Sequence, residues 1–186
     1  MFRQDVSPNR SLQTTTARTA GFTLIELLVV IVIIGILATF ATLSIGNRAL
    51  DDRLEVESKR LEQTLKLALE EAETKGIDIG FSYTQEHYQF LALDKSGIWT
   101  PYVASGPLRP REIPAPFYFE LRIEDRPVMP ASASLDSKDK KVEPQILLLS
   151  SGEVTAFSVD IKAENYDPYY HIQADTLGKF QRERRD

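Results

Sequence analysis

Serine, histidine and carboxylate side chains are the groups in this sequence that could perform catalysis. Ser150, Ser151 and His171 supply hydroxyl and imidazole groups, and a serine nucleophile with a histidine base can be assembled from them and any of several carboxylates. A Ser-Ser-Gly triplet between two apolar runs is, however, typical of a tight hairpin turn. His87 and His171 both fall in expected strands, where packing is the usual role. The pattern therefore predicts that the chain is not an enzyme.

Metal and cofactor chemistry has little support in the composition. The chain has 0 cysteines and 2 histidines, which excludes thiolate nucleophiles, cysteine-based zinc or iron–sulfur sites and a histidine-rich metal site. Asp136 and Asp139 lie in a polar stretch that could offer oxygen ligands to calcium, but their spacing matches no known calcium loop. We expect no metal and no cofactor.

Glu26 is the charged residue with the most informative surroundings. It is the only charged side chain between Phe22 and Ile45. A carboxylate within an apolar membrane segment costs about 2.5–3.5 kcal/mol at the bilayer centre and less near an interface. Two interpretations follow: Glu26 is a tolerated carboxylate near the headgroups, or it is an anion that meets a buried cation.

The segment around Glu26 has the length and composition of a membrane helix. As a helix, residues 22–45 would extend roughly 36 Å, which exceeds a hydrocarbon core of about 30 Å. Arginines before the segment, against balanced charges after it, predict that the body lies outside the cytoplasm. The charged residues are Arg3, Arg10 and Arg18 before it and Arg48, Asp51, Asp52 and Arg53 after it. A buried core helix, or a cleavable signal cut near Ala41, is a weaker alternative.

The start of this segment carries a family resemblance. Gly21-Phe-Thr-Leu-Ile-Glu26, after a polar basic leader and before a long apolar run, resembles the processing motif of type IV prepilins and type II secretion pseudopilins. The resemblance implies that a prepilin peptidase/methyltransferase cleaves between Gly21 and Phe22 and methylates the new terminus at Phe22. It also implies that Glu26 pairs with the terminal amine of a neighbouring subunit, because a buried unpaired charge is costly.

The rest of the chain predicts an α+β fold. Apolar residues recur at steps of three and four between residues 47 and 75, with a gap at Ser58, and Gly76 follows as a helix stop. The period then changes to two, which indicates antiparallel strands, with residues 154–162 pairing with 145–149 across the Ser-Ser-Gly turn. Expected strands cover residues 77–84, 87–94, 98–103, 117–124, 145–149, 154–162 and 171–180, and residues 106–116 and 126–144 are expected to be irregular. We expect a pilin-like fold: a long helix, transmembrane then amphipathic, packed on antiparallel sheet.

The body sharpens the resemblance. Residues 144–157, which contain the Ser-Ser-Gly turn, are similar to the C-terminal hairpin of the H-type minor pseudopilins of type II secretion, and residues 61–93 are similar to the same family. Ala156 stands where that motif often has proline. The resemblance implies a structural subunit of the periplasmic pseudopilus, at its tip, that helps to export folded proteins and binds other pseudopilins. A minor pilin of a type IV pilus is the nearest alternative, and a membrane-tethered periplasmic enzyme or binding protein is a more distant one.

Charge and hydropathy complete the predicted organisation. The net charge is −5; the first 21 residues carry +2, which leaves −7 for the remainder. An acidic body argues against nucleic acid as a partner. The C-terminal run Arg182-Glu-Arg-Arg185 could contact anionic lipid or nucleic acid, but Glu183 and Asp186 beside its arginines favour a solvated tail. We expect a single-pass protein of the bacterial inner membrane with its C-terminal domain in the periplasm. The predicted parts are residues 1–21 (cleaved leader), 22–46 (transmembrane and assembly helix), 47–76 (amphipathic helix) and 77–186 (periplasmic β-rich domain).

Overall fold

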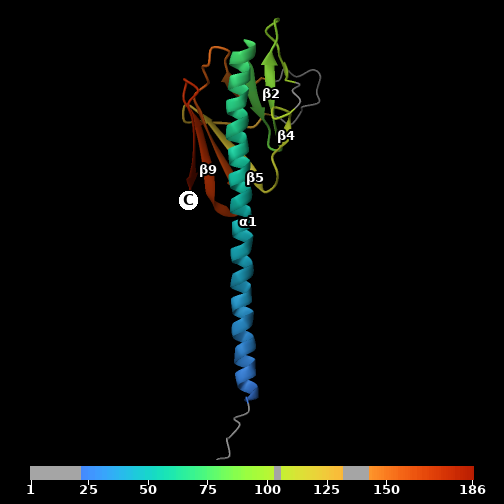
Figure 1. Cartoon of the computed structure of the whole chain (residues 1–186), viewed down its shortest axis with the longest axis vertical. Helices are drawn as coiled ribbons and strands as arrows, with labels where there is room; N and C mark the ends of the chain where they lie inside the picture. Colours follow the sequence, from blue (N-terminus) through green and yellow to red (C-terminus); the bar gives the residue numbers. More distant parts are fainter. Residues whose placement is uncertain (1–21, 103–105, 132–142) are drawn as a thin grey trace, which may run out of the picture. The chain divides into compact units, whose positions relative to one another are not determined.

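A computed structural model describes residues 22–102, 106–131 and 143–186, without the side chains of residues 40–47. The chain forms two units, Met1–Ser44 and Ile45–Asp186, and helix α1 (Leu24–Lys75) contributes to both. In the second unit α1 packs against two antiparallel β-sheets (Figure 1). The predicted α+β fold is therefore confirmed, including the continuous helix.

The second half of α1 packs on the sheets because its apolar side chains share one face. Ser58, which interrupts the apolar pattern, is itself fully buried, and its hydroxyl donates to the Glu55 carbonyl at 2.8 Å. Leu50 is partly buried at the edge of the same face. The buried apolar members of the face are Leu54, Leu61, Leu65, Ala68, Leu69 and Ala72.

The helix ends where the sequence predicts. Gly76 adopts φ 64°, and the Ile77 amide donates to the Ala72 carbonyl at 3.1 Å, which is the hydrogen bond of a Schellman motif. Lys75 in the last turn lies 2.6 Å from Glu71 and donates to the Tyr102 hydroxyl at 2.8 Å. Hydrogen bonding to Glu71, and then to Tyr102, raises the pKa of Lys75.

The first sheet contains strands from the middle of the chain. Its order is β3-β2-β1-β7, and β4 pairs with a different part of β2. Every pairing in it is antiparallel. The strands are β1 (Ile79–Tyr83), β2 (His87–Leu93), β3 (Trp99–Pro101), β4 (Arg111–Glu112) and β7 (Ile146–Leu148).

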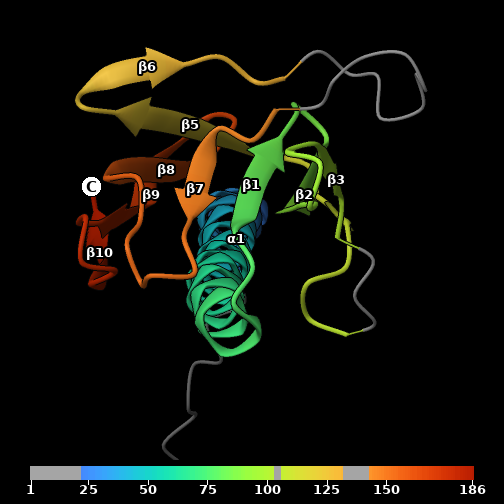
Figure 2. The same cartoon turned by 90° about the horizontal axis from the view of Figure 1, so that it is seen from above.

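The second sheet collects the C-terminal strands, in the order β10-β9-β8-β5-β6. Its pairings are also antiparallel. Viewed along α1, the strands of the two sheets are arranged around one side of the helix (Figure 2). The strands are β5 (Phe117–Ile123), β6 (Arg126–Val128), β8 (Phe157–Ala163), β9 (Tyr166–Ala174) and β10 (Phe180–Arg185).

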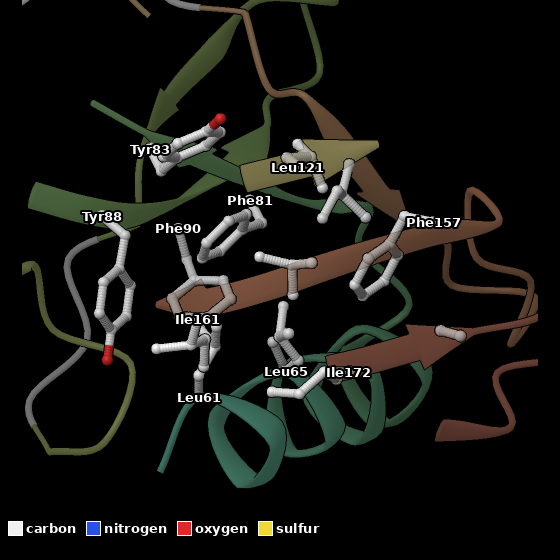
Figure 3. Packing of buried hydrophobic residues seen from close by; sticks show 14 of the residues in the cluster. Leu61, Leu65, Phe81, Tyr83, Tyr88, Phe90, Leu121, Phe157, Ile161 and Ile172 are labelled. Atoms are coloured by element: carbon white, nitrogen blue, oxygen red, sulfur yellow. The ribbon is translucent and has the colours of Figure 1, made fainter. Parts of the chain in front are cut away.

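One hydrophobic core joins α1 to both sheets. Leu61 and Leu65 of the helix meet Phe81 and Phe90 of the first sheet and Ile161 of the second (Figure 3). All five side chains are at most 2% exposed. Burial of this kind is the main source of stability in a small domain.

Strand β1 differs from the expected alternation because both of its faces are covered. All five of its residues are buried, including Gly80 and Ser82. A Cβ atom at Gly80 would lie 2.3 Å from the Cβ of Pro144 and 3.2 Å from the Trp99 ring. Pro144 and Trp99 therefore cover the face that period two assigned to solvent.

Three predicted strand assignments need correction. Residues 145–149 and 154–162 do not form one hairpin: β7 joins the first sheet and β8 the second, and the single bridge Leu148–Val154 remains between them. Residues 171–180 contain the end of β9, a turn and the start of β10. The predicted irregular stretch from residue 126 begins with strand β6, which pairs with β5.

The C-terminal arginines form a strand and not a solvated tail. β10 pairs with β9 along its whole length, and Arg182 reaches across to α1. Its guanidinium donates to Glu62 at 3.2 Å and to the buried Ser58 hydroxyl at 3.2 Å, and lies 4.9 Å from the centre of the Tyr170 ring. Ser58 thus interrupts the apolar face of α1 at the position where Arg182 of β10 contacts the helix.

Arg182→Ala should lower the free energy of unfolding by about 1–3 kcal/mol, because hydrogen bonds to a charged group are lost and buried Ser58 loses a partner. Arg185→Ala is the matched control, since Arg185 pairs with Glu183 on the other face of the same strand and is exposed; it should cost less than about 1 kcal/mol. Chemical denaturation followed by circular dichroism measures both. Equal losses for the two variants would contradict this role of Arg182.

Candidate assembly site at the N-terminus

The first turn of α1 contains Glu26, and Phe22 lies two residues before the helix begins. Thr23 precedes the helix, and its hydroxyl accepts a hydrogen bond from the Glu26 amide at 3.3 Å, while its carbonyl accepts from the same amide at 3.1 Å. Thr23 is therefore the N-cap, and Glu26 occupies the third helical position. Thr-x-x-Glu is the sequence of a capping box. The capping role of Thr23 is not among the sequence-based predictions, although the Thr-x-x-Glu spacing indicates it.

Phe22 and Glu26 are both exposed. Phe22 is 73% exposed and lies one residue before the N-cap. Within the described part of the chain, Glu26 forms no ion pair. An anion near a helix N-terminus is favourable, because unpaired amides and the helix dipole make that end positive. Gly21, the other predicted site residue, lies outside the described residues.

The helix that follows Glu26 exposes apolar side chains on all of its faces. Between Leu24 and Leu37 each large apolar residue is at least 43% exposed. Thr39 adds a hydroxyl that donates to the Gly35 carbonyl at 2.9 Å, so this polar group is satisfied within the helix. Exposed apolar surface of this extent marks a site of interaction with protein or membrane.

Among the residues described with their side chains, no helix is long and apolar enough to cross a membrane. The predicted membrane segment continues over residues 40–45, which lie outside that set.

The catalytic alternative does not assemble. The Ser150 hydroxyl and amide both donate to Asp78 at 2.9 Å, next to the first sheet. His171 lies in the second sheet, where its Nδ1 is 2.5 Å from Asp160 Oδ1 and both side chains are 11% exposed. Ser150 and His171 thus bond different carboxylates, Asp78 beside the first sheet and Asp160 within the second, and Ser151 bonds a third, Glu153.

No cluster of three or more metal-ligating side chains occurs in the described ranges. His87 lies 4.0 Å from Glu86 and 3.9 Å from Glu112, but this imidazole and the two carboxylates do not form a metal-ligating cluster. Asp136 and Asp139, whose spacing does not match a calcium loop, fall outside the described residues.

Comparisons with known proteins identify the family. Residues 16–42 match the family model for the prokaryotic N-terminal methylation motif. Type II secretion system protein H of Pseudomonas aeruginosa is 34% identical over 140 residues, which cover 74% of this chain and 79% of that protein. The chain belongs to the type II secretion system protein H family.

A second relative agrees with this membership, and a solved structure agrees with the fold. The protein H of Aeromonas hydrophila is 26% identical over 168 residues, covering 87% of this chain and 92% of the relative. The crystal structure of the minor pseudopilin EpsH from the type II secretion system of Vibrio cholerae matches with a TM-score of 0.59 at 20% identity, over 72% of this chain and 97% of that structure. The predicted family and the predicted pilin-like fold are both confirmed.

Proposed function

We propose that this protein H family member is a minor pseudopilin, a structural subunit of the periplasmic pseudopilus that assembles near its tip and helps to export folded proteins across the outer membrane. The observation that carries the proposal is the N-terminal turn. Glu26, which forms no ion pair among the described residues, lies in the first turn of a helix with exposed apolar side chains, shortly after Gly21 and Phe22 in sequence. Such a helix needs apolar surroundings, which the membrane and a fibre of like helices both provide.

Processing follows from the same turn. Cleavage between Gly21 and Phe22 by a prepilin peptidase would leave an amine at Phe22, which the same enzyme methylates. This cation would adjoin the positive end of α1, where a positive charge is unfavourable. Glu26 of a neighbouring subunit is the anion that can neutralise it in the apolar interior of a fibre.

The organisation follows the predicted parts. Residues 1–21 are a cytoplasmic leader, residues 22–46 anchor the chain in the inner membrane and later assemble, residues 47–76 continue as the amphipathic helix, and residues 77–186 form the periplasmic domain. Family membership supports the anchor, since the methylation motif spans residues 16–42. Partners in this proposal are the other pseudopilins and the peptidase/methyltransferase.

Competing functions have less support. A minor pilin of a type IV pilus shares the leader and helix, but the relatives that match over most of the chain are secretion proteins H. A membrane-tethered enzyme would need a catalytic site, and the candidate serine and histidine bond different carboxylates, Ser150 to Asp78 and His171 to Asp160.

Replacement of Gly21 should test the processing step. Gly21→Leu should block cleavage, because the peptidase must accommodate this position, and should leave the uncleaved chain in the membrane. Mass measurement of the extracted protein distinguishes a terminus at Met1 from a methylated terminus at Phe22. Complementation of export in a strain that lacks the native gene should fail for the variant.

The wild type supplies the control for this experiment. It should yield a methylated Phe22 terminus, restore export and co-purify with other pseudopilins. A wild-type terminus near Ala41, or export restored equally by the uncleaved variant, would overturn the proposed processing.

A further inference from the structure

We propose that a groove beside α1, here called the Arg111 groove, binds a carboxylate-bearing segment of another pseudopilin. The groove has a volume of about 460 Å³ and lies between α1 and the segment that leads into β4. Figure 1 shows β4 beside α1. The inference rests on the proposed function and names a contact surface away from the N-terminal helix.

The walls of the groove are held by the folded core. Leu108, in the segment before β4, is 3% exposed, and Arg111 begins β4 opposite Tyr88 in β2. On the helix side, Leu67 is partly buried against the core, and Thr64 is 4% exposed. The groove is therefore formed before any partner arrives, which limits the entropy lost on binding.

The charges in the groove favour an anion beside Arg111. Arg60 and Lys66 also line it, but Arg60 is bound by Glu57 at 2.5 and 2.6 Å and Lys66 by Glu62 at 2.8 Å. Within the described ranges, Arg111 has no ion pair, and its Nε donates one long hydrogen bond, 3.5 Å, to the Pro107 carbonyl. A guanidinium left without a carboxylate is suited to a bidentate contact with one.

The remaining lining defines the rest of the occupant. Leu67 and Pro107 add apolar surface, so an apolar side chain next to the carboxylate would be desolvated there. Glu70 contributes one negative charge to the lining, which opposes an acidic occupant. An acidic segment with an adjacent apolar residue, on a neighbouring subunit of the same fibre, satisfies Arg111 and the apolar wall.

Charge reversal tests the proposal in the full-length chain. Membranes from cells that express each variant are solubilised, and the pseudopilins that co-purify with the tagged chain are quantified. Arg111→Glu should reduce the recovery of one pseudopilin by roughly tenfold, as for loss of a charge pair at an interface. Arg109→Glu, a matched change at an exposed arginine outside the groove, should leave recovery within about twofold of the wild type.

A second variant tests the sign of the occupant's charge. Glu70→Gln removes the carboxylate of the lining and should retain or increase recovery. A loss comparable to that of Arg111→Glu would overturn the acidic occupant. Circular dichroism of each purified variant verifies that the fold is retained, since both positions are on the surface.

Cross-linking identifies the occupant directly. The chain has 0 cysteines, so Gln63→Cys, within the groove, carries a single thiol for a maleimide–benzophenone probe. Illumination should join the chain to another pseudopilin, whereas Ser96→Cys, in the β2–β3 turn, should not. A homodimer, or no product, would overturn the proposed occupant.

The co-purification experiment separates failure of the groove from failure of the proposed function. If the wild type recovered no pseudopilin at all, the proposed function itself would fail; normal recovery with Arg111→Glu would refute the groove alone.

Discussion

Phe81→Ala should lower the free energy of unfolding by about 3–5 kcal/mol, the cost of truncating a fully enclosed aromatic side chain. Phe81 is 2% exposed in β1, the strand that lies between β2 and β7. Its ring lies 5.7 Å from the rings of Tyr88 and Phe90 and 6.4 Å from that of Tyr83. These neighbours are held by strand pairing and cannot move to fill the cavity.

Tyr118→Ala is the control for this prediction. It removes an aromatic ring that is 38% exposed on β5 and should cost less than half as much. Thermal unfolding of the detergent-solubilised full chain can be followed by the fluorescence of Trp99, the single tryptophan. Similar destabilisation by the two variants would show that Phe81 is not at the centre of the core.

The helix is the part of the fold that can best be predicted from the sequence. Its buried face follows from steps of three and four, and Gly76 stops it because a glycine tolerates the positive φ of a C-terminal cap. Both signals are local: they depend on residues within one or two turns of each other. Propensity and tertiary structure agree here, so the prediction was confirmed.

Sheet membership could not be predicted because it depends on distant pairings. The Ser-Ser-Gly turn has the expected local geometry, with the Gly152 amide donating to the Leu149 carbonyl at 2.9 Å. After Thr155, however, the chain no longer pairs with β7. Phe157 pairs instead with Ile123 and Ala174 in the second sheet. Two apolar runs around a turn resemble a hairpin whether or not their strands stay together.

The two ends of the chain show the same distinction. Glu26 stands out from its neighbours alone, because a single charge in an apolar run is conspicuous wherever the run lies. For Arg182 the sequence predicts a solvated tail, because acidic residues lie beside it along the chain. Its partner Ser58 is 124 residues away, and nothing local to either residue indicates their contact.

Glu26→Ala should abolish assembly of the chain into the pseudopilus while leaving cleavage and membrane insertion intact. In the proposed fibre, the Phe22 amine of the neighbour would then enter an apolar interior without an anion. Breaking a buried ion pair by removing one partner costs about 3–5 kcal/mol, which is a loss of roughly 100-fold or more in association. Insertion should become slightly easier, because a charge has left the apolar segment.

The structure adds an alternative that the experiment must separate. Glu26 is also the third helical residue after the Thr23 N-cap. Its replacement could therefore reduce assembly by destabilising the first turn of α1, without any ion pair being involved. Glutamine serves equally well at this position of a capping box. Glu26→Gln therefore keeps the cap and removes the charge, whereas Glu26→Asp keeps a shortened carboxylate.

The three variants give different outcomes under the two interpretations. If Glu26 pairs with the neighbour's amine, the Glu26→Gln variant should assemble poorly, at best between Glu26→Ala and the wild type, because glutamine retains a hydrogen-bond acceptor but no charge. The Glu26→Asp variant should retain part of the wild-type assembly. If Glu26 only caps the helix, Gln should assemble like the wild type. Co-purification with other pseudopilins and export of a secreted protein measure assembly, and the mass of the processed terminus verifies that cleavage at Phe22 is unchanged. Normal assembly and export by Glu26→Gln would refute the pairing role and leave Glu26 as a capping carboxylate.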